Sequence, residues 1–166
     1  MKDVSDTDLQ GHWSVIFFYP ADFTFVCPTE LEDLSDHYDQ FRKLNCEIYS
    51  VSTDSAYVHK AWADASKSIA KIRYPMLSDS ATWLSRFFGV YIEETGQALR
   101  GTSSSTPGEI KPMRCMTWAS AAMPTNWCAS WKPRNSSPST ATQVCPAKWK
   151  PGAATLKPGL DLVGKL

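Results

Sequence analysis

The sequence contains YPADFTFVCPTE at residues 19–30, and this run determines how the first half of the chain is interpreted. Residues 13–19, which lead into it, are apolar and β-rich, as is typical of a buried strand. After it, apolar side chains recur at helical spacing: Leu31, Leu34, Tyr38, Phe41 and Leu44. We therefore predict that Cys27 lies at a junction between a strand and a helix.

The position of Cys27 favours a reactive thiol. The N–H groups in the first turn of a helix have no partner within the helix and stabilise negative charge, so we predict that the pKa of Cys27 falls from roughly 8.5 toward 6–7. Such a thiol is a nucleophile at neutral pH. The alternative is a buried structural cysteine, which is a common role for a lone cysteine.

The same run resembles the active-site loop of the peroxiredoxins. Pro20, Thr24 and Cys27 match that family's pattern Pro-x-x-x-Thr-x-x-Cys. The flanking letters, FFYP at 17–20 and CPTEL at 27–31, resemble the two-cysteine group of the alkyl hydroperoxide reductase C type. Near the other end, VCPAKWKPG at 144–152 and DLVGKL at 161–166 resemble that group's resolving-cysteine motif and C-terminus.

The resemblance implies a reaction carried out by two cysteines. Cys27 would attack the peroxide and become a sulfenic acid, and Cys145 would resolve it by forming a disulfide between two subunits. Cys46 lies in a β-rich segment, and we predict that it belongs to the core.

The resemblance also implies roles for four residues near Cys27. Thr24 would donate its hydroxyl to the thiolate and the bound peroxide, and Pro20 would shield the pocket from water. Arg100 occupies the place expected of the family's active-site arginine, where it would stabilise the thiolate, and Glu30 would orient it. The alternatives are a local loop hydrogen bond for Thr24 and a solvated charge for Arg100.

The order of predicted elements indicates an α/β fold. Further strands are predicted at 47–52 and 76–77 and a hairpin turn at 94–96. Helices are predicted at 81–88 and after residue 52, the latter with Thr53 or Asp54 as its N-cap. Strands alternating with helices indicate a central sheet covered on both faces. The resemblance makes this a thioredoxin-like fold with a mixed sheet, in which residues 1–143 form the peroxidase domain and residues 144–166 form a resolving arm.

Residues 103–143 do not resemble the family, apart from GEIK at 108–111. Ser, Thr, Ala, Pro and Trp dominate them without a strand or helix period, and prolines at 112, 124, 133 and 138 exclude a long helix. We predict an irregular segment, and whether the sheet is complete after Thr102 stays open. Our hypothesis is that this segment is translated out of frame; rereading the nucleotides would reject it if no other frame encodes patterned sequence there.

Composition excludes several functional classes. The 166 residues have a net charge of zero and are 43% hydrophobic, which suits one domain and gives no indication of nucleic-acid or membrane binding. With no signal peptide and no apolar run of bilayer length, we expect a cytoplasmic protein. Its 5 cysteines then favour redox chemistry over a disulfide framework. We predict no metal site, and surface positions for His12, His37 and His59.

The resemblance implies a peroxidase for hydrogen peroxide and alkyl hydroperoxides that needs no haem, metal or flavin. It implies a flavoprotein disulfide reductase as the reductant, with thioredoxin as the second choice. It also implies a homodimer, with a decamer of dimers as a further option. The alternative is a catalytically impaired structural or holdase-like oligomer. A thiol–disulfide oxidoreductase is disfavoured because no second cysteine lies near Cys27.

Overall fold

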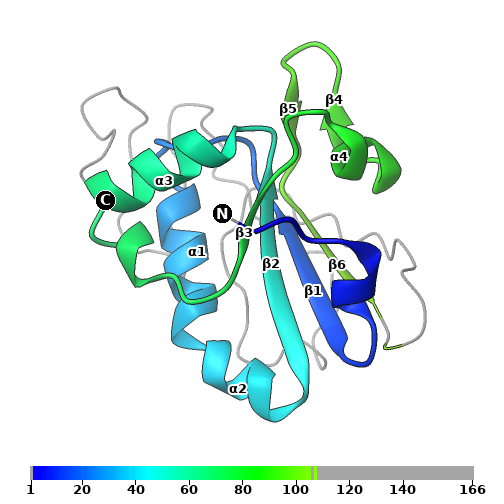
Figure 1. Cartoon of the computed structure of the whole chain (residues 1–166). Helices are drawn as coiled ribbons and strands as arrows, with labels where there is room; N and C mark the ends of the chain where they lie inside the picture. The colour runs from blue at the N-terminus through cyan, green and yellow to red at the C-terminus, as the bar shows by residue number, and fades with distance from the viewer. Residues whose placement is uncertain (1, 106, 108–166) are drawn as a thin grey trace, which may run out of the picture.

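A computed structural model describes residues 2–105 and 107, and these residues form an α/β fold (Figure 1). Its elements in chain order are η1 (Asp6–Leu9), β1 (Trp13–Phe18), α1 (Cys27–Asp36), α2 (Tyr38–Lys43), β2 (Cys46–Ser52), α3 (Ala56–Ala65), η2 (Ile69–Lys71), β3 (Met76–Ser78), α4 (Trp83–Phe87), β4 (Tyr91–Ile92), β5 (Gln97–Ala98) and β6 (Gly101–Ser105).

The central sheet is mixed and has the strand order β3-β2-β1-β6. The strand pairs β1–β2 and β2–β3 are parallel, so each needs a crossover, which α1 with α2 and then α3 provide. The last strand, β6, runs antiparallel to β1 and places Gly101 opposite Phe18. The predicted mixed sheet is confirmed.

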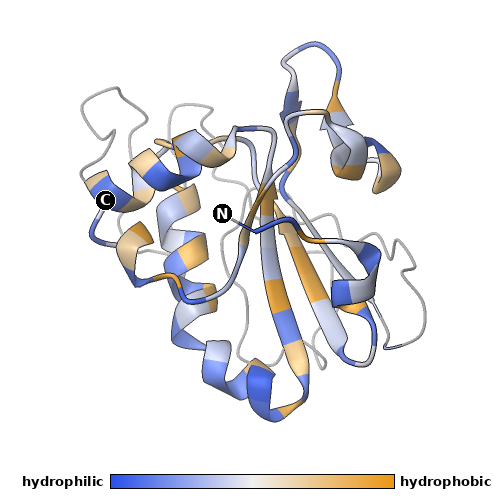
Figure 2. Cartoon of the chain, in the orientation of Figure 1, coloured by the Kyte–Doolittle hydropathy of each residue, from blue (hydrophilic) through white to orange (hydrophobic). Residues whose placement is uncertain are grey.

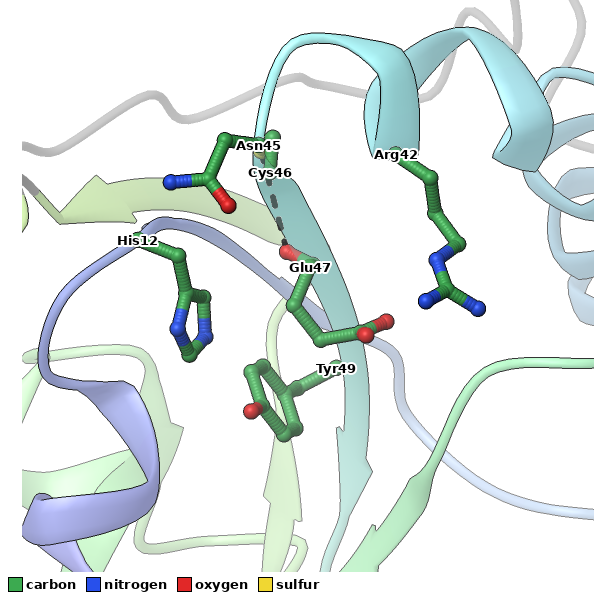
Figure 3. A pocket seen from close by; sticks show the side chains of 6 residues that line it. All are labelled: His12, Arg42, Asn45, Cys46, Glu47 and Tyr49. Carbon is green, nitrogen blue, oxygen red and sulfur yellow. Dashed lines mark hydrogen bonds between the residues drawn. The ribbon is translucent and has the colours of Figure 1, made fainter.

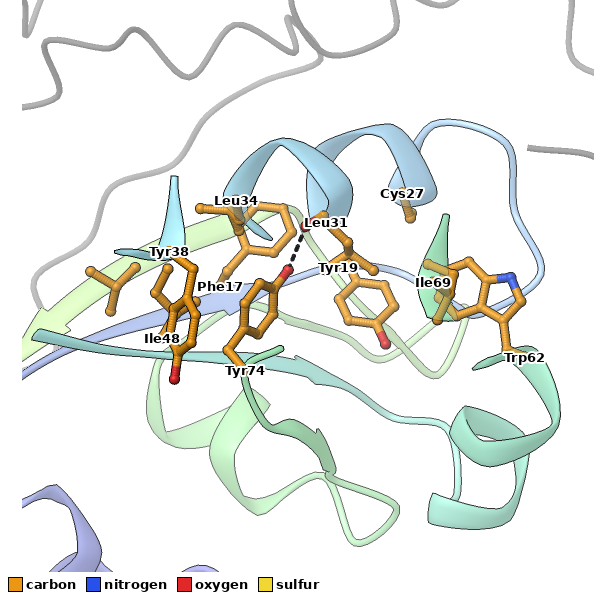
Figure 4. Packing of buried hydrophobic residues seen from close by; sticks show 11 residues of the cluster. Phe17, Tyr19, Cys27, Leu31, Leu34, Tyr38, Ile48, Trp62, Ile69 and Tyr74 are labelled. Atoms are coloured by element: carbon orange, nitrogen blue, oxygen red, sulfur yellow. Dashed lines mark hydrogen bonds between the residues drawn. The ribbon is translucent and has the colours of Figure 1, made fainter. Parts of the chain in front are cut away.

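Alternate residues of β1 face two different cores. Val15 and Phe17 pack with residues of α1, α3 and η2 in the larger cluster, which Figure 4 shows from close by. Ile16 and Phe18 pack on the other face with Phe88 and neighbouring side chains from the α4 and β4–β5 region. In Figure 2 the orange colour of hydrophobic residues accordingly runs along β1, which lies between the two clusters. Both faces of the sheet are therefore covered, as predicted.

Most of the predicted elements agree with the structure, but one predicted helix is divided and one N-cap differs. The predicted strands correspond to β1, β2 and β3, and the turn at 94–96 joins β4 to β5. The helix predicted from Pro28 is divided at His37 into α1 and α2. The N-cap of α3 is Ser55, whose hydroxyl accepts a hydrogen bond from the Val58 amide, rather than Thr53 or Asp54.

Three residues of the segment predicted to be irregular form a strand. Ser103, Ser104 and Ser105 belong to β6 and pair with Ile16, Val15 and Ser14. The prediction is wrong for these residues because backbone hydrogen bonds to β1 hold a strand without apolar side chains. Residue 106, residues 108–143, the predicted boundary at 143–144 and the arm at 144–166 lie outside the described residues. Of the helices that the structure describes, none is long and apolar enough to cross a membrane.

Candidate active site

Cys27 is the first residue of α1, directly after the loop from β1, and its side chain is fully buried. Figure 4 shows it at the end of α1, in the same cluster as Tyr19 and Trp62. Pro28 follows in the first helical turn, where its missing N–H costs nothing. In the loop, Phe23 adopts the left-handed conformation (φ 54°), which is unusual for an aromatic residue.

The sheet brings Arg100 to Cys27 across a long stretch of sequence. Gly101 of β6 pairs with Phe18 at the end of β1, so Arg100 lies where the loop to Cys27 begins. The Arg100 Nη2 donates a hydrogen bond to Cys27 Sγ at 3.2 Å, and its Nε donates to Glu30 Oε2 at 3.0 Å. Cys27 and Glu30 are one helical turn apart on α1, so a single guanidinium reaches both.

Thr24 and Pro20 also lie in this loop. The Thr24 hydroxyl donates to the Ala21 carbonyl at 3.0 Å, which is the local loop hydrogen bond expected as the alternative to a functional role. The same side chain acts on the thiol, because it lowers the pKa of Cys27. Pro20 is half-buried at the start of the loop. The structure therefore brings Thr24, Arg100 and Glu30 together around Cys27, whereas Cys145 lies outside the described residues.

Electrostatics in this site oppose the simple helix-terminus argument. Burial raises the pKa of Cys27; Arg100 lowers it, Glu30 raises it, and the Thr24 hydroxyl and the Ala21 backbone lower it. The net direction is upward, so the predicted fall is wrong for this conformation, because desolvation of a fully buried thiolate outweighs the stabilising groups. Burial likewise raises the pKa of Glu30 against the effect of Arg100. Burial lowers the pKa of Arg100, but the neighbouring Cys27 and Glu30 raise it, and the net direction is upward.

Sequence reasoning missed a buried polar network beside the loop. His59, predicted to be at the surface, is only 6% exposed, and its Nδ1 lies 2.6 Å from Asp22 Oδ2. Asp22 also accepts a hydrogen bond from the Tyr19 hydroxyl at 2.8 Å. A sequence signal existed, because His59 and Trp62 are three residues apart and so share the buried face of α3.

A pocket lies at the opposite end of β1 and β2, away from Cys27 (Figure 3). Its volume is about 220 Å³, and its lining residues are His12, Arg42, Asn45, Cys46, Glu47 and Tyr49. Cys46 is half-buried at the edge of the larger core cluster rather than fully inside it. Burial and the Glu47 charge raise its pKa to about 11, which leaves the thiol protonated at neutral pH. Within residues 2–105 and 107, His, Cys, Asp and Glu side chains form no group of three or more suited to a metal ion.

Known proteins resemble this chain in sequence and in structure. Residues 1–108 match the sequence model of the AhpC/TSA family. Alkyl hydroperoxide reductase C of Bacillus subtilis (strain 168) is 47% identical over 165 residues, covering 99% of this chain and 88% of that protein. The crystal structure of Enterococcus faecalis AhpC superposes with a TM-score of 0.62 and 59% identity, over 63% of this chain and 62% of that chain. The reduced 2-Cys peroxiredoxin of Plasmodium vivax superposes with a TM-score of 0.64 and 31% identity, over 69% of this chain and 72% of that chain. The chain therefore belongs to the AhpC/TSA family and is a peroxiredoxin of the alkyl hydroperoxide reductase C type.

Proposed function

We propose that this chain is a thiol-dependent peroxidase that reduces hydrogen peroxide and alkyl hydroperoxides with Cys27 as its nucleophile. The observation that carries the proposal is the hydrogen bond of 3.2 Å from Arg100 to Cys27 Sγ, at the first residue of a helix. A guanidinium on a thiol is the arrangement that stabilises a thiolate and the negative charge that develops on a leaving oxygen. Family membership supports the same chemistry.

In the first step the Cys27 thiolate attacks one oxygen of R–O–O–H. An S–O bond forms, the O–O bond breaks, and the leaving alkoxide takes a proton to become an alcohol or, from hydrogen peroxide, water. Sulfur is oxidised to a sulfenic acid. Arg100 stabilises the charge on the oxygens, and the Thr24 hydroxyl does so once it turns from the Ala21 carbonyl to the peroxide. Glu30 orients Arg100, and Pro20 excludes water.

In the second step the Cys145 thiolate of a partner subunit attacks the sulfenic sulfur. A disulfide forms, and the hydroxide that leaves takes a proton to become water. A dithiol donor then returns two electrons and two protons. The proposed donor is a flavoprotein disulfide reductase, with thioredoxin as the second choice. The homodimer, its assembly into a decamer and a cytoplasmic location are parts of the same proposal.

The alternative, an impaired structural or holdase-like oligomer, is not favoured. It would predict a disrupted site, whereas Arg100 is bonded to both Cys27 and Glu30. These bonds depend on β6, whose pairing with β1 places Arg100 at the end of β1. The first three residues of the segment suspected of damaging the fold therefore complete the strand that positions this arginine.

Peroxide consumption by the purified full chain, supplied with a dithiol reductant, tests the proposal. Hydrogen peroxide and an organic hydroperoxide are assayed separately, and a circular dichroism melt establishes that the protein is folded. We expect many turnovers per protein molecule with both substrates. A folded protein that consumes neither peroxide faster than the reductant alone does would overturn the proposal.

A further inference from the structure

His59 presents both nitrogens of its ring to oxygen acceptors. Nδ1 lies 2.6 Å from Asp22 Oδ2, and Nε2 lies 3.2 Å from the carbonyl oxygen of Leu77 in β3. A neutral imidazole has only one N–H group, so one of these oxygens would then face a lone pair. Only the imidazolium donates to both acceptors. The geometry therefore favours a buried cation at His59.

This cation belongs to a network that holds Asp22 from several elements. The Tyr19 hydroxyl at the end of β1 donates to Asp22 Oδ1 at 2.8 Å. The Asp22 amide donates to Asp54 Oδ2 at 2.9 Å, and the hydroxyl of Ser52 in β2 donates to the same oxygen at 2.8 Å. Tyr19, Asp22 and His59 are all nearly inaccessible to solvent. The network thus fixes the middle of the loop to α3, β2 and β3.

The same loop carries the groups that act on the thiol. Ala21 directly precedes Asp22, Thr24 lies two residues after it, and both lower the pKa of Cys27. They are also joined to each other by the hydrogen bond from the Thr24 hydroxyl to the Ala21 carbonyl. A displacement of Asp22 therefore moves both groups relative to Cys27, even though His59 makes no contact with the thiol among the described interactions.

We propose that the imidazolium of His59 is a positioning residue for Cys27, because its two N–H groups tie Asp22 to the Leu77 carbonyl and so hold Ala21 and Thr24 in place beside the thiol. The catalytic consequence rests on the proposed peroxidase function. The protonation state of His59 and its restraint on the loop do not rest on that function. Reaction at Cys27 then depends on a proton carried by a residue of α3.

The charged groups around His59 determine where this proton is lost. Burial alone would lower the pKa of His59, but Asp22, the Leu77 carbonyl and Asp54 raise it above the ordinary value. Tyr19 faces the same carboxylate from β1, and burial raises its pKa well above the ordinary value, so it stays neutral. A raised pKa in the folded state means that the restraint is complete below about pH 6.5. The restraint is lost as the pH rises through the raised pKa that His59 has in the folded state.

Nitrogen-15 NMR of the histidine rings in the full chain tests the protonation state directly. We expect both ring nitrogens of His59 to carry a proton at pH 7, with a titration midpoint above the ordinary value for histidine. The His59→Gln variant assigns the signal by its disappearance. A neutral His59 ring at pH 7, with a single N–H, would overturn the proposal whether or not the protein reduces peroxide.

Two rate constants at Cys27 test the positioning role. In the His59→Gln variant we expect the rate constant with hydrogen peroxide to fall about 10- to 100-fold, because misplaced groups lose transition-state stabilisation. Alkylation of Cys27 by iodoacetamide, followed by peptide mass spectrometry, also needs the thiolate but not the groups that stabilise the peroxide oxygens, so its rate should fall less than the peroxide rate. His37→Gln is the matched control, since His37 also contacts an aspartate, Asp33, but lies at the far end of α1.

Equal peroxide rates in the wild type and the His59→Gln variant would overturn the positioning role, as would a parallel fall of both rates in a folded variant. Since loss of a buried cation can unfold the chain, Asp22→Asn provides a second variant that keeps an oxygen acceptor at this position. We expect Asp22→Asn to lower the titration midpoint of His59. We also expect it to reduce the peroxide rate more than the alkylation rate, as in the His59→Gln variant. If the wild type does not reduce peroxide, the proposed function fails, while the NMR titration and the alkylation rates still decide whether His59 restrains the loop.

Discussion

The two ends of β1 each lie beside a cysteine, but the surroundings of the two thiols differ. At the C-terminal end, Cys27 begins a helix and accepts a hydrogen bond from Arg100 at 3.2 Å. At the N-terminal end, Cys46 begins β2 opposite Trp13, and its thiol contacts the carbonyl oxygen of Glu47 at 3.8 Å. Both thiols have a raised pKa because of burial.

The difference shows that a pocket beside a cysteine is not sufficient for reactivity. The pocket of about 220 Å³ lies at Cys46, where Glu47 adds to the rise in pKa. Arg42 also lines it, but its guanidinium lies over the Tyr38 ring at 5.9 Å from the centroid. At Cys27, a bonded guanidinium opposes the effect of burial. The position of a cation, rather than the size of a cavity, therefore distinguishes the candidate nucleophile.

The largest expected effect comes from removing each sulfur in turn. Cys27→Ser should abolish peroxide reduction, because an alcohol does not supply the anion that attacks the O–O bond. Cys46→Ser should retain the wild-type rate. Peroxide consumption with a dithiol reductant measures both, and retained turnover in the Cys27 variant would reject its role as the nucleophile.

The next effect comes from the arginine near each thiol. Arg100→Met should raise the pKa of Cys27 by roughly one to two units, because a cation bonded to the thiolate is lost. The rate constant with peroxide at pH 7 should fall about 10- to 100-fold. Arg42→Met should leave the pKa of Cys46 unchanged. Titration of thiolate absorbance checks both pKa values, and an unchanged Cys27 midpoint would show that Arg100 does not stabilise the thiolate.

A smaller effect is expected from the carboxylate beside each cysteine. Glu30→Gln and Glu47→Gln should each lower the pKa of the neighbouring thiol, because both glutamates raise it in the structure. Glu30→Gln keeps an oxygen that can accept from Arg100, so its peroxide rate should change less than in Arg100→Met. The same absorbance titration applies. A rise in the pKa of Cys27 would mean that Glu30 acts mainly by holding Arg100.

The smallest effect concerns stability at the N-terminal end of β1. Ser14 and Ser105 lie opposite each other, and neither buried hydroxyl has a hydrogen-bond partner among the residues that the structure describes. Replacing both by alanine should raise the free energy of unfolding by about 1 kcal/mol, since an unsatisfied buried hydroxyl is destabilising. Urea denaturation measures this, with Ser104→Ala as the control. A loss of stability in the double variant would contradict the interpretation.

Much of the fold was predictable because hydrophobic periodicity determines it locally. The strand at 13–19, the strand at 47–52 and the turn at 94–96 correspond to observed elements. The strand at 103–105 was not predictable from its own side chains, since its serines show no apolar alternation. Pairing with β1 decides it, and pairing is a long-range property.

The site was predictable to the extent that a motif marks it. Pro20, Thr24 and Cys27 form such a motif, and the resemblance placed Arg100 near them. The raised pKa of Cys27 was not predictable, because it depends on the complete burial of the thiol. His59 was missed for a related reason: its partners, Asp22 and Leu77, come from different parts of the chain.

Mass spectrometry of the oxidised full chain tests the central claim most directly. In a Cys145→Ser variant, the sulfenic acid should persist after a stoichiometric amount of hydrogen peroxide, so a dimedone adduct marks the reacted sulfur. Peptide mapping then compares the two ends of β1. We predict the adduct on the peptide that contains Cys27, with Cys46 unmodified. An adduct on Cys46 with Cys27 unmodified would contradict the account.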